Sequence, residues 1–328
     1  MRQLELCNQQ VRIVDAPDPT PRDDWVVVKI MASPICGSDR HAFFAESPCG
    51  GGHEGSGEVV AVDKPERLKV GDRVSLGPLA GCRQCDLCAA GDYIHCLDQP
   101  TVGPHFAEYT LAQEFVTPPL PDDVDFEIGS LAGCALGPSL GAISRMGTGP
   151  QHTLLVTGLG PVGLGAVVVG AFRGARVLGV EPEPWRRERA SRLGADAVLD
   201  PADGDPAAAI AELTAGLGPH HAIDCSGKTP GERLCIDAVR RRGKVAFCGE
   251  NPDDIPLGPS RDMIRKGIDL IGGWHFNLNL YPEMFRILGE SPVVGQLISH
   301  RFGFDRAQEA FDTFFGGQAA KVLLKPWE

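Results

Sequence analysis

Two different patterns of apolar and polar positions divide the chain. Before about residue 140, short alternating or apolar runs are separated by Pro, Gly and Asp turn signals, which favours a mostly β half. The clearest of these runs are VVVKI (26–30), GEVVAV (57–62) and DRVSLGP (72–78). From about Gln151 onward, apolar strand-like runs alternate with helix-like periods, which predicts an α/β half.

The α/β half begins with a βαβ pattern. The strand-like TLLVT (153–157) is followed by a glycine-rich turn, a helical run to about Arg173 and a second strand-like run, ARVLGV (175–180). The alternation continues with RRERASRLG (186–194), AVLD (197–200), AAAIAELTAG (207–216), HAIDCSG (221–227), GERLCIDAVRR (231–241) and KVAFCG (244–249). We predict a parallel sheet of about six strands in a doubly wound domain. A last short strand is expected at KVLLKP (321–326).

Length and composition narrow the class of protein. A chain of 328 residues predicts two domains, and 43% hydrophobic with 23% charged residues is typical of soluble globular proteins. The formal net charge of −12 disfavours nucleic acid or an anionic membrane as a partner, because both are polyanions. A small-molecule partner fits better. The first residues contain no continuous apolar stretch of signal-peptide length, so we expect a cytoplasmic protein.

Four of the eleven cysteines are clustered in one short segment. Cys82, Cys85, Cys88 and Cys96 follow the spacing C-x2-C-x2-C-x7-C. Clustered cysteines in a reducing compartment bind metal more readily than they form disulfides. Four thiolates satisfy a tetrahedral zinc and leave no position for water or substrate, so this zinc would be structural. Bacterial iron–sulfur runs begin in the same way but continue with x3-C-P, which this chain lacks.

A second set of metal-binding residue types lies upstream. The run Cys36-Gly-Ser-Asp-Arg-His41 is followed, 17 residues after its cysteine, by a histidine in Gly52-His-Glu-Gly55. A catalytic zinc needs three protein ligands and one open position, and Cys36 and His53 could supply two of the ligands. From these residues alone, a packed core Cys or His and a surface Glu54 remain open as alternatives.

Taken in order, Cys36-Gly-Ser-Asp39, the Gly-His-Glu triplet, the four-cysteine segment and the later glycine-rich βαβ unit resemble the zinc-containing medium-chain alcohol dehydrogenase family. The resemblance spans nearly the whole chain. The polyol and threonine dehydrogenase branch is most similar, also through His300-Arg-Phe302 and Asp305-Arg-Ala-Gln-Glu-Ala-Phe311. The resemblance implies a mostly β, GroES-like catalytic zinc-binding domain (residues 1–141 and 275–328) and a Rossmann domain that binds NAD (residues 142–274).

The resemblance also implies roles for individual residues. Cys134, in Ala132–Pro138, falls on the family's third zinc-ligand position, so Cys36, His53 and Cys134 would hold a catalytic zinc. Polyol dehydrogenases commonly have Glu-Pro there, and this departure leaves open whether Glu54 ligates zinc or exchanges with water. Ser38 matches the hydroxyl that accepts the substrate's proton, and His41 matches the distal member of the relay, a solvated loop histidine being its alternative. Asp39 matches the carboxylate that orients the histidine ligand.

The glycine-rich turn predicts the coenzyme site. Gly158, Gly160, Pro161, Val162 and Gly163 connect a strand to a helix, and Glu181 lies 21 residues after Gly160 at the end of the next strand. The glycines let the backbone approach a pyrophosphate, which meets the amides at the helix N-terminus. Glu181 would bind ribose hydroxyls and repel a 2′-phosphate, so NAD is favoured. NADP stays open because Arg186 or Arg187 could reach a phosphate, and Arg186 could also lie on the adenine side.

These features predict an oxidoreductase with two zinc ions per chain that transfers a hydride between NAD and a secondary alcohol: a polyol, cyclitol, sugar or amino alcohol. The alternatives are an NADP-dependent aldehyde or ketone reductase, a zinc-free quinone or enoyl reductase, and a non-catalytic dinucleotide-binding protein. The segment after Asp269 resembles the strand through which the family's coenzyme domains pair, so a homodimer or homotetramer is expected. Phe43, Phe44, Trp274 and His275 are pocket candidates that could equally be core or interface residues. The flanking interval from Arg40 to Gly52 is shorter than family members usually have.

Overall fold

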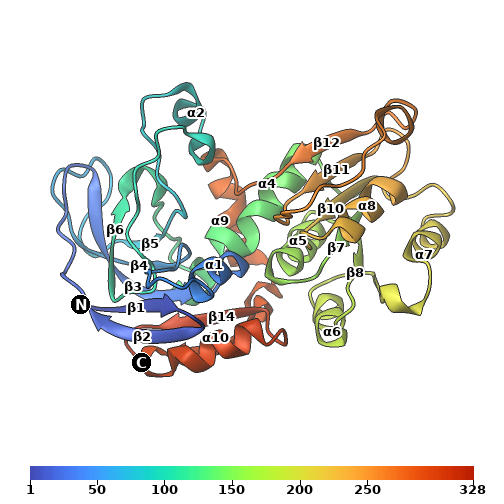
Figure 1. The fold of residues 1–328 in the computed structure, drawn as a ribbon. Coiled ribbons are helices and arrows are strands. Elements are labelled where there is room, and N and C mark those ends of the chain that lie inside the picture. The colour runs from blue at the N-terminus through green and yellow to red at the C-terminus, as the bar shows by residue number, and fades with distance from the viewer. The chain divides into compact units, whose positions relative to one another are not determined.

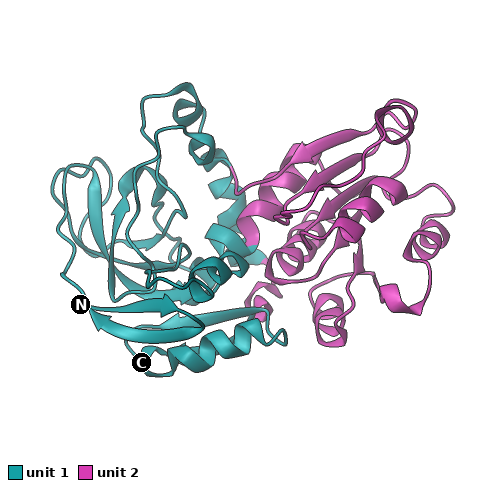
Figure 2. Ribbon diagram, in the orientation of Figure 1, with its two compact units in different colours: residues 1–135, 277–290, 298–328 teal, residues 136–276, 291–297 magenta.

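The computed structural model describes residues 1–328 and consists of two compact units (Figures 1 and 2). Unit 1 comprises residues 1–135, 277–290 and 298–328, and unit 2 comprises residues 136–276 and 291–297. The domain limits inferred from the sequence stay a prediction, because compactness alone does not define which part binds the coenzyme.

Unit 1 is built mainly from β-strands around one sheet. Its strands lie in the order β13-β14-β3-β4-β5, with β6 beside β3, and β1 and β2 form a separate antiparallel pair. Only β13 and β14 run parallel within the larger sheet. The strands are β1 (Arg2–Cys7), β2 (Gln10–Asp15), β3 (Trp25–Pro34), β4 (Ser56–Ala61), β5 (Arg73–Ser75), β6 (Tyr109–Gln113), β13 (Ile298–Gly303) and β14 (Lys321–Lys325). The helices are α1 (Arg40–Phe43), α2 (Asp86–Ala89), α3 (Phe126–Gly129), α9 (Tyr281–Glu290) and α10 (Ala307–Phe315).

An aromatic cluster forms one core of unit 1. Phe43 of α1 stacks on Phe311 and Phe315 of α10, with ring centroids 5.3 and 5.0 Å apart. Phe106 and Leu4 are buried in the same cluster. Phe43, left open by the sequence as a pocket or a core residue, is therefore a core residue.

Unit 2 contains the predicted doubly wound sheet of six parallel strands. Their order is β12-β11-β10-β7-β8-β9, and every pairing is parallel. The strands are β7 (Thr153–Thr157), β8 (Arg176–Val180), β9 (Ala197–Leu199), β10 (His221–Asp224), β11 (Lys244–Phe247) and β12 (Asp269–Gly272). The helices are α4 (Gly137–Met146), α5 (Pro161–Phe172), α6 (Pro184–Arg192), α7 (Pro206–Leu213) and α8 (Thr229–Ala238). Strands β8 and β9 follow β7 on one side of the sheet, and β11 and β12 follow β10 on the other side. The strand order therefore reverses between the neighbours β7 and β10.

One apolar helical stretch, residues 126–146, is long enough to cross a membrane by length and composition. It is interrupted by a turn of π-helix at Ala132–Leu136, which contains Cys134. Of its most apolar window, 83% is buried inside the protein, as is usual for core helices.

Three histidines gather where β7 and β10 begin. The ring of His152 stacks on His221 at 4.5 Å and lies 5.3 Å from that of His220. The Nδ1 atoms of His152 and His220 accept hydrogen bonds from the backbone N–H groups of Gly149 and Thr153. A nitrogen that accepts an N–H cannot itself carry a proton, so these bonds favour neutral rings. Burial, with the neighbouring histidines, lowers the pKa of His221 to about 4.

This cluster predicts that acid weakens unit 2. The pKa of His221 is about 4 in the folded protein against an ordinary value of 6.5. As the pH falls through this window the unfolded chain binds the proton first, so the free energy of unfolding decreases. His221→Asn, whose amide can replace Nδ1 at the Thr148 hydroxyl, should lose about 3 kcal/mol less than the wild type between pH 7 and pH 4.

Urea denaturation at the two pH values measures this difference, with His300→Asn in unit 1 as the control. Equal losses of stability in the wild type and His221→Asn would contradict the role of His221.

Candidate metal and coenzyme sites

The four clustered cysteines lie close together in residues 82–96 of unit 1, a segment here called the four-cysteine lobe. The Sγ atoms of Cys82 and Cys88 are 4.0 Å apart, and those of Cys85 and Cys96 are 3.8 Å apart. Two thiolates on one tetrahedral zinc, with Zn–S distances of about 2.3 Å, would be about 3.8 Å apart. The donor set and its spacing therefore fit a closed zinc site.

Backbone N–H groups also favour the ionised form of Cys82, which is the form that binds metal. The Sγ of Cys82 accepts hydrogen bonds from the N–H groups of Gln84 and Cys85, at 3.5 and 3.4 Å. These bonds lower the pKa of Cys82 to about 7. Burial raises the pKa of Cys88 to about 12, so this thiol needs a cation to ionise at neutral pH.

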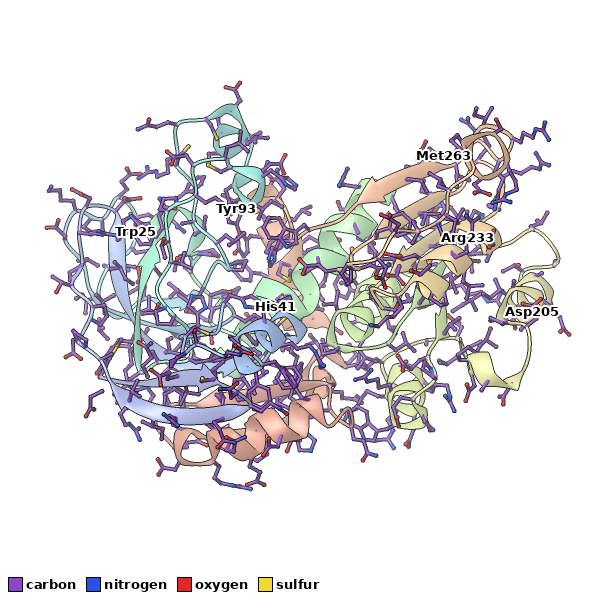
Figure 3. All side chains as sticks on the ribbon, viewed as in Figure 1. Trp25, His41, Tyr93, Asp205, Arg233 and Met263 are labelled. Carbon is purple, nitrogen blue, oxygen red and sulfur yellow. The ribbon has the colours of Figure 1, made fainter.

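The side-chain amide of Asn277 connects the four-cysteine lobe to the rest of unit 1 by two hydrogen bonds. The Nδ2 of Asn277 donates to the backbone oxygen of Ala90 and to Asp92, both at 2.8 Å. Gly91, with φ of +82°, lies so close that an added Cβ would be 2.6 Å from the Asn277 Oδ1. Tyr93, labelled in Figure 3, is fully buried within the lobe. This anchoring suits a structural role.

The second candidate metal cluster joins residues that are far apart in the sequence. Cys36 follows β3, His53 and Glu54 precede β4, and Cys134 lies in the π-helical turn. One ligand atom from each lies within 4.8 Å of the others, and the Sγ atoms of Cys36 and Cys134 are 3.4 Å apart. Soft sulfur, imidazole and carboxylate form a donor set that fits zinc.

Asp39 holds two members of this cluster in place. Its Oδ2 accepts a hydrogen bond from the backbone N–H of Cys36 at 2.7 Å, and its Oδ1 lies 3.6 Å from the Nδ1 of His53. A hydrogen bond from Cys134, together with the cations of Lys321 and His53, lowers the pKa of Cys36. Burial opposes the charge on His53, but the Cys36 thiolate and Asp39 raise its pKa well above the ordinary value.

A buried ion pair lies beside the cluster. The Nζ of Lys321, at the start of β14, donates to the Oε1 of Glu54, and both side chains are fully buried. The Oε2 of Glu54 is buried as well and has no hydrogen-bond partner, so it is free to accept from or bind a cation. Burial raises the pKa of Glu54 to about 7, although Lys321 acts in the opposite direction.

The sequence pattern predicted no role for Lys321 or His105. Lys321 lies in the predicted final strand, and a lysine that starts an otherwise apolar run is a signal that could have marked a buried charge. His105 is 1% exposed, and its Nδ1, without a hydrogen-bond partner, faces Gly55 next to Glu54. Burial lowers the pKa of His105 to about 3, so this ring is neutral. No pattern in the sequence pointed to it.

The proposed relay residues lie on the surface of unit 1. Ser38 is exposed in a short 3-10 helix (Gly37–Asp39), and His41 is exposed on α1, where Figure 3 labels it. The catalytic roles of both side chains stay a prediction. Phe44, next to them on the chain, is 39% exposed and lies under the guanidinium of Arg40.

The glycine-rich turn in unit 2 has the form that a dinucleotide site needs. Gly158 follows β7 with φ of +77°, and Gly160 is the N-cap of α5, whose first two residues are Pro161 and Val162. A Cβ on Gly163 would lie 1.9 Å from the backbone oxygen of Gly158, so only glycine allows the helix to pack this closely.

Glu181 lies where the sequence predicted an acid, directly after β8. Its Oε2 accepts a hydrogen bond from the backbone N–H of Leu159 in the glycine-rich turn, at 2.6 Å. The Nη1 of Arg186 is 3.9 Å from the Oε1 of Glu181. Arg187 instead binds Asp200 and the backbone oxygen of Glu181. Of the two arginines, only Arg186 therefore has its guanidinium beside the Glu181 carboxylate.

Comparison with known proteins extends this picture. The chain matches the family models of the alcohol dehydrogenase GroES-like domain over residues 22–122 and of zinc-binding dehydrogenases over residues 161–290. It is 31% identical to an uncharacterized zinc-type alcohol dehydrogenase-like protein of Escherichia coli, over 97% of this chain and 96% of the relative. It is 30% identical to sorbitol dehydrogenase of Bacillus subtilis, over 97% and 95% of the two chains.

Solved structures agree with these matches. Alcohol dehydrogenase TADH from Thermus sp. ATN1 is 25% identical and superimposes with a TM-score of 0.91 over 99% of both chains. Galactitol-1-phosphate dehydrogenase from Escherichia coli, at 24% identity, has the same fold, with a TM-score of 0.91 over 99% of this chain and all of its own. The predicted combination of a GroES-like and a Rossmann domain is confirmed.

These matches favour an enzyme over the alternative of a non-catalytic dinucleotide-binding protein. The chain belongs to the zinc-containing medium-chain alcohol dehydrogenase family, in its polyol and threonine dehydrogenase branch, and is an enzyme of alcohol oxidation and reduction.

Proposed function

We propose that this enzyme oxidises a secondary alcohol group of a polyol, cyclitol, sugar or amino alcohol with NAD, and that it holds two zinc ions per chain. The observation that carries the proposal is the convergence of Cys36, His53 and Cys134 beside a buried carboxylate. Relatives named sorbitol, D-arabitol-phosphate and L-threonine 3-dehydrogenase support the substrate class.

The two proposed zinc sites have different roles. Cys36, His53 and Cys134 would hold a catalytic zinc, and Cys82, Cys85, Cys88 and Cys96 a structural one. When bound, the catalytic zinc supplies Lewis acidity toward an alcohol oxygen, and NAD supplies the hydride acceptor. Three protein ligands would leave one position for substrate.

The side chains around the cluster balance its charge. On metal binding both cysteines would ionise, and the two thiolates, the Glu54 carboxylate and the Lys321 ammonium would carry a net double negative charge that a divalent cation neutralises. Asp39 fixes the His53 imidazole through its Nδ1 side. The unpartnered Oε2 of Glu54 supports a carboxylate that can approach the metal or accept a hydrogen bond from water. In this proposal, Lys321 holds the other oxygen.

The alcohol proton needs a path to solvent. In our proposal the Ser38 hydroxyl accepts it, and His41 passes it to water. Both side chains are exposed, which suits groups that exchange protons with solvent. The same path would run inward during carbonyl reduction.

The coenzyme would bind unit 2 at Gly158, Gly160, Pro161, Val162, Gly163 and Glu181. The Glu181 carboxylate would accept bonds from ribose hydroxyls and repel a 2′-phosphate, which supports NAD. An NADP-dependent aldehyde or ketone reductase is the second candidate. It is favoured by Arg186, whose buried Nε has no hydrogen-bond partner, and by a zinc-binding dehydrogenase from Sinorhizobium meliloti, 25% identical and solved with NADP, at a TM-score of 0.88.

We also propose a cytoplasmic homodimer or homotetramer that acts on small molecules, without nucleic acid or membrane partners. Strand β12 pairs on one side only, with β11, so its other edge could pair with a second copy. Trp274, two residues beyond β12, is 43% exposed, and His275 is buried.

Metal analysis and a substrate screen test the two zinc sites. Two zinc ions per chain are expected, with NAD reduction by secondary polyols, cyclitols, sugars or amino alcohols. Cys36→Ser should lose one zinc and nearly all turnover, because the substrate would bind at the open position of the metal that this variant no longer holds. Cys85→Ser should lose the other zinc and mainly thermal stability. Retention of both metal and activity in Cys36→Ser would exclude the catalytic assignment.

The buried ion pair predicts a stability effect that is independent of turnover. Lys321→Met should lower the free energy of unfolding by about 3–5 kcal/mol, because it leaves the Glu54 charge buried without a partner. The double variant Glu54→Leu with Lys321→Met should recover most of this loss. Urea denaturation of metal-free protein measures both effects. A Lys321→Met variant as stable as the wild type would show that Glu54 does not need this counter-charge.

Glu181 predicts the coenzyme preference. Glu181→Ser should lower the ratio of kcat/KM for NAD to that for NADP by roughly tenfold or more, because one repelled charge is worth about 1–3 kcal/mol. Arg186→Ala in this background should reverse part of the gain with NADP. A wild type that already prefers NADP would support the second candidate function instead.

A further inference from the structure

A buried carboxylate in unit 2 has no part in the mechanism described above. Asp224, the last residue of β10, is fully buried. Its Oδ1 accepts hydrogen bonds from the hydroxyls of Thr157 and Ser226, at 2.7 and 2.6 Å, and its Oδ2 accepts one from the backbone N–H of Gly227, at 3.0 Å. The carboxylate therefore joins the end of β7 to the loop that follows β10.

The Asp224 carboxylate lies at the carboxyl ends of two neighbouring strands, β7 and β10. Thr157 ends β7, and Asp224 is its register partner at the end of β10. These are the two strands between which the strand order reverses, and open α/β sheets bind ligands outside the carboxyl ends of the strands at that point. Both side-chain oxygens of Asp224 accept hydrogen bonds from the protein itself, from hydroxyls and from a backbone N–H at this end of the sheet.

Ser226 connects this carboxylate to the glycine-rich turn. A Cβ on Gly158 would lie 2.5 Å from the Cβ of Ser226 and 2.7 Å from its backbone nitrogen, so the turn rests directly on this residue. The backbone N–H of Cys225 also donates to the backbone oxygen of Thr157, at 2.8 Å. A shift of Ser226 would therefore shift Gly158.

Glycines on neighbouring segments make room for the same group. A Cβ on Gly231, in α8, would lie 2.5 Å from the Ser226 Oγ and 2.8 Å from the Asp224 Oδ1. A Cβ on Gly249, after β11, would lie 2.1 Å from the Gly227 nitrogen. Side chains at these positions would push the 225–227 loop away from Asp224, so the packing allows one arrangement of that loop.

We propose that Asp224 is a positioning residue for the coenzyme, which fixes the glycine-rich turn through Ser226 so that the pyrophosphate site is formed before the coenzyme binds. The proposal rests on the dinucleotide binding in unit 2 that the proposed function requires. Preorganisation of this kind increases affinity because the loop pays less ordering entropy on binding.

Hydrogen-bond geometry, rather than charge, is the essential property in this proposal. An asparagine at position 224 can still accept from the Gly227 N–H with its oxygen and donate to the two hydroxyls with its nitrogen, because hydroxyls can rotate to accept. An alanine loses all three bonds. Asp224→Asn and Asp224→Ala are therefore expected to have different effects on coenzyme binding.

Titration of metal-loaded protein with NADH, followed by fluorescence, tests the proposal without turnover. Asp224→Ala should bind NADH roughly tenfold to a hundredfold more weakly, and Asp224→Asn should bind close to wild type. Ser226→Ala and Thr157→Val should each weaken binding severalfold, which keeps the test valid if Asp224→Ala does not fold. In turnover, KM for NAD should rise, while kcat and KM for the alcohol stay unchanged.

Thr153→Val makes the same chemical change as Thr157→Val at the opposite end of β7 and is the matched control. Wild-type NADH affinity in folded Asp224→Ala and Ser226→Ala would overturn the proposal, as would equal losses in the Asn and Ala variants. If the wild type bound neither NADH nor NADPH, the proposed function itself would be wrong, which is a different result.

Discussion

The structure of unit 1 depends on neutralising the charges that are buried in it. Two cysteines, a histidine and a glutamate meet in its interior, and the only fully buried lysine of the chain lies against that glutamate. Ionised groups are costly to bury unless they are paired or bind metal. The sheet meets this need because β3, β4 and β14 are neighbours, and each supplies or adjoins one of these groups. In the proposed function, zinc binding would therefore be coupled to the folding of unit 1.

Unit 2 depends on close backbone packing rather than on charge. Gly158, Gly163, Gly227 and Gly249 lie where any Cβ would collide with a neighbouring backbone atom. This packing brings the glycine-rich turn, the 225–227 loop and the end of β11 together around Asp224. Backbone amides and two buried carboxylates, Asp224 and Glu181, thus shape the proposed coenzyme site.

The two candidate zinc clusters differ in how their ligands are supplied. The four-cysteine lobe uses all its ligands from one short segment, and Asn277 fastens that lobe to unit 1. The other cluster draws its ligands from three segments and has a carboxylate oxygen without a partner. A closed site stiffens a loop, whereas a site with an open position can bind a reactant. Asp39 and Lys321 belong only to the second cluster.

The sequence by itself determined the glycine-rich turn and the four-cysteine spacing, because each is a pattern within a few residues. It also determined the parallel sheet, because strand-like and helix-like runs alternate from residue 153 to residue 249. Family resemblance was needed to join Cys134 to Cys36 and His53, since 98 residues separate the two cysteines. Only the tertiary structure identified Lys321, His105 and Asp224. Their importance comes from burial and from partners on other strands, and periodicity along the chain does not record which charges the fold places together.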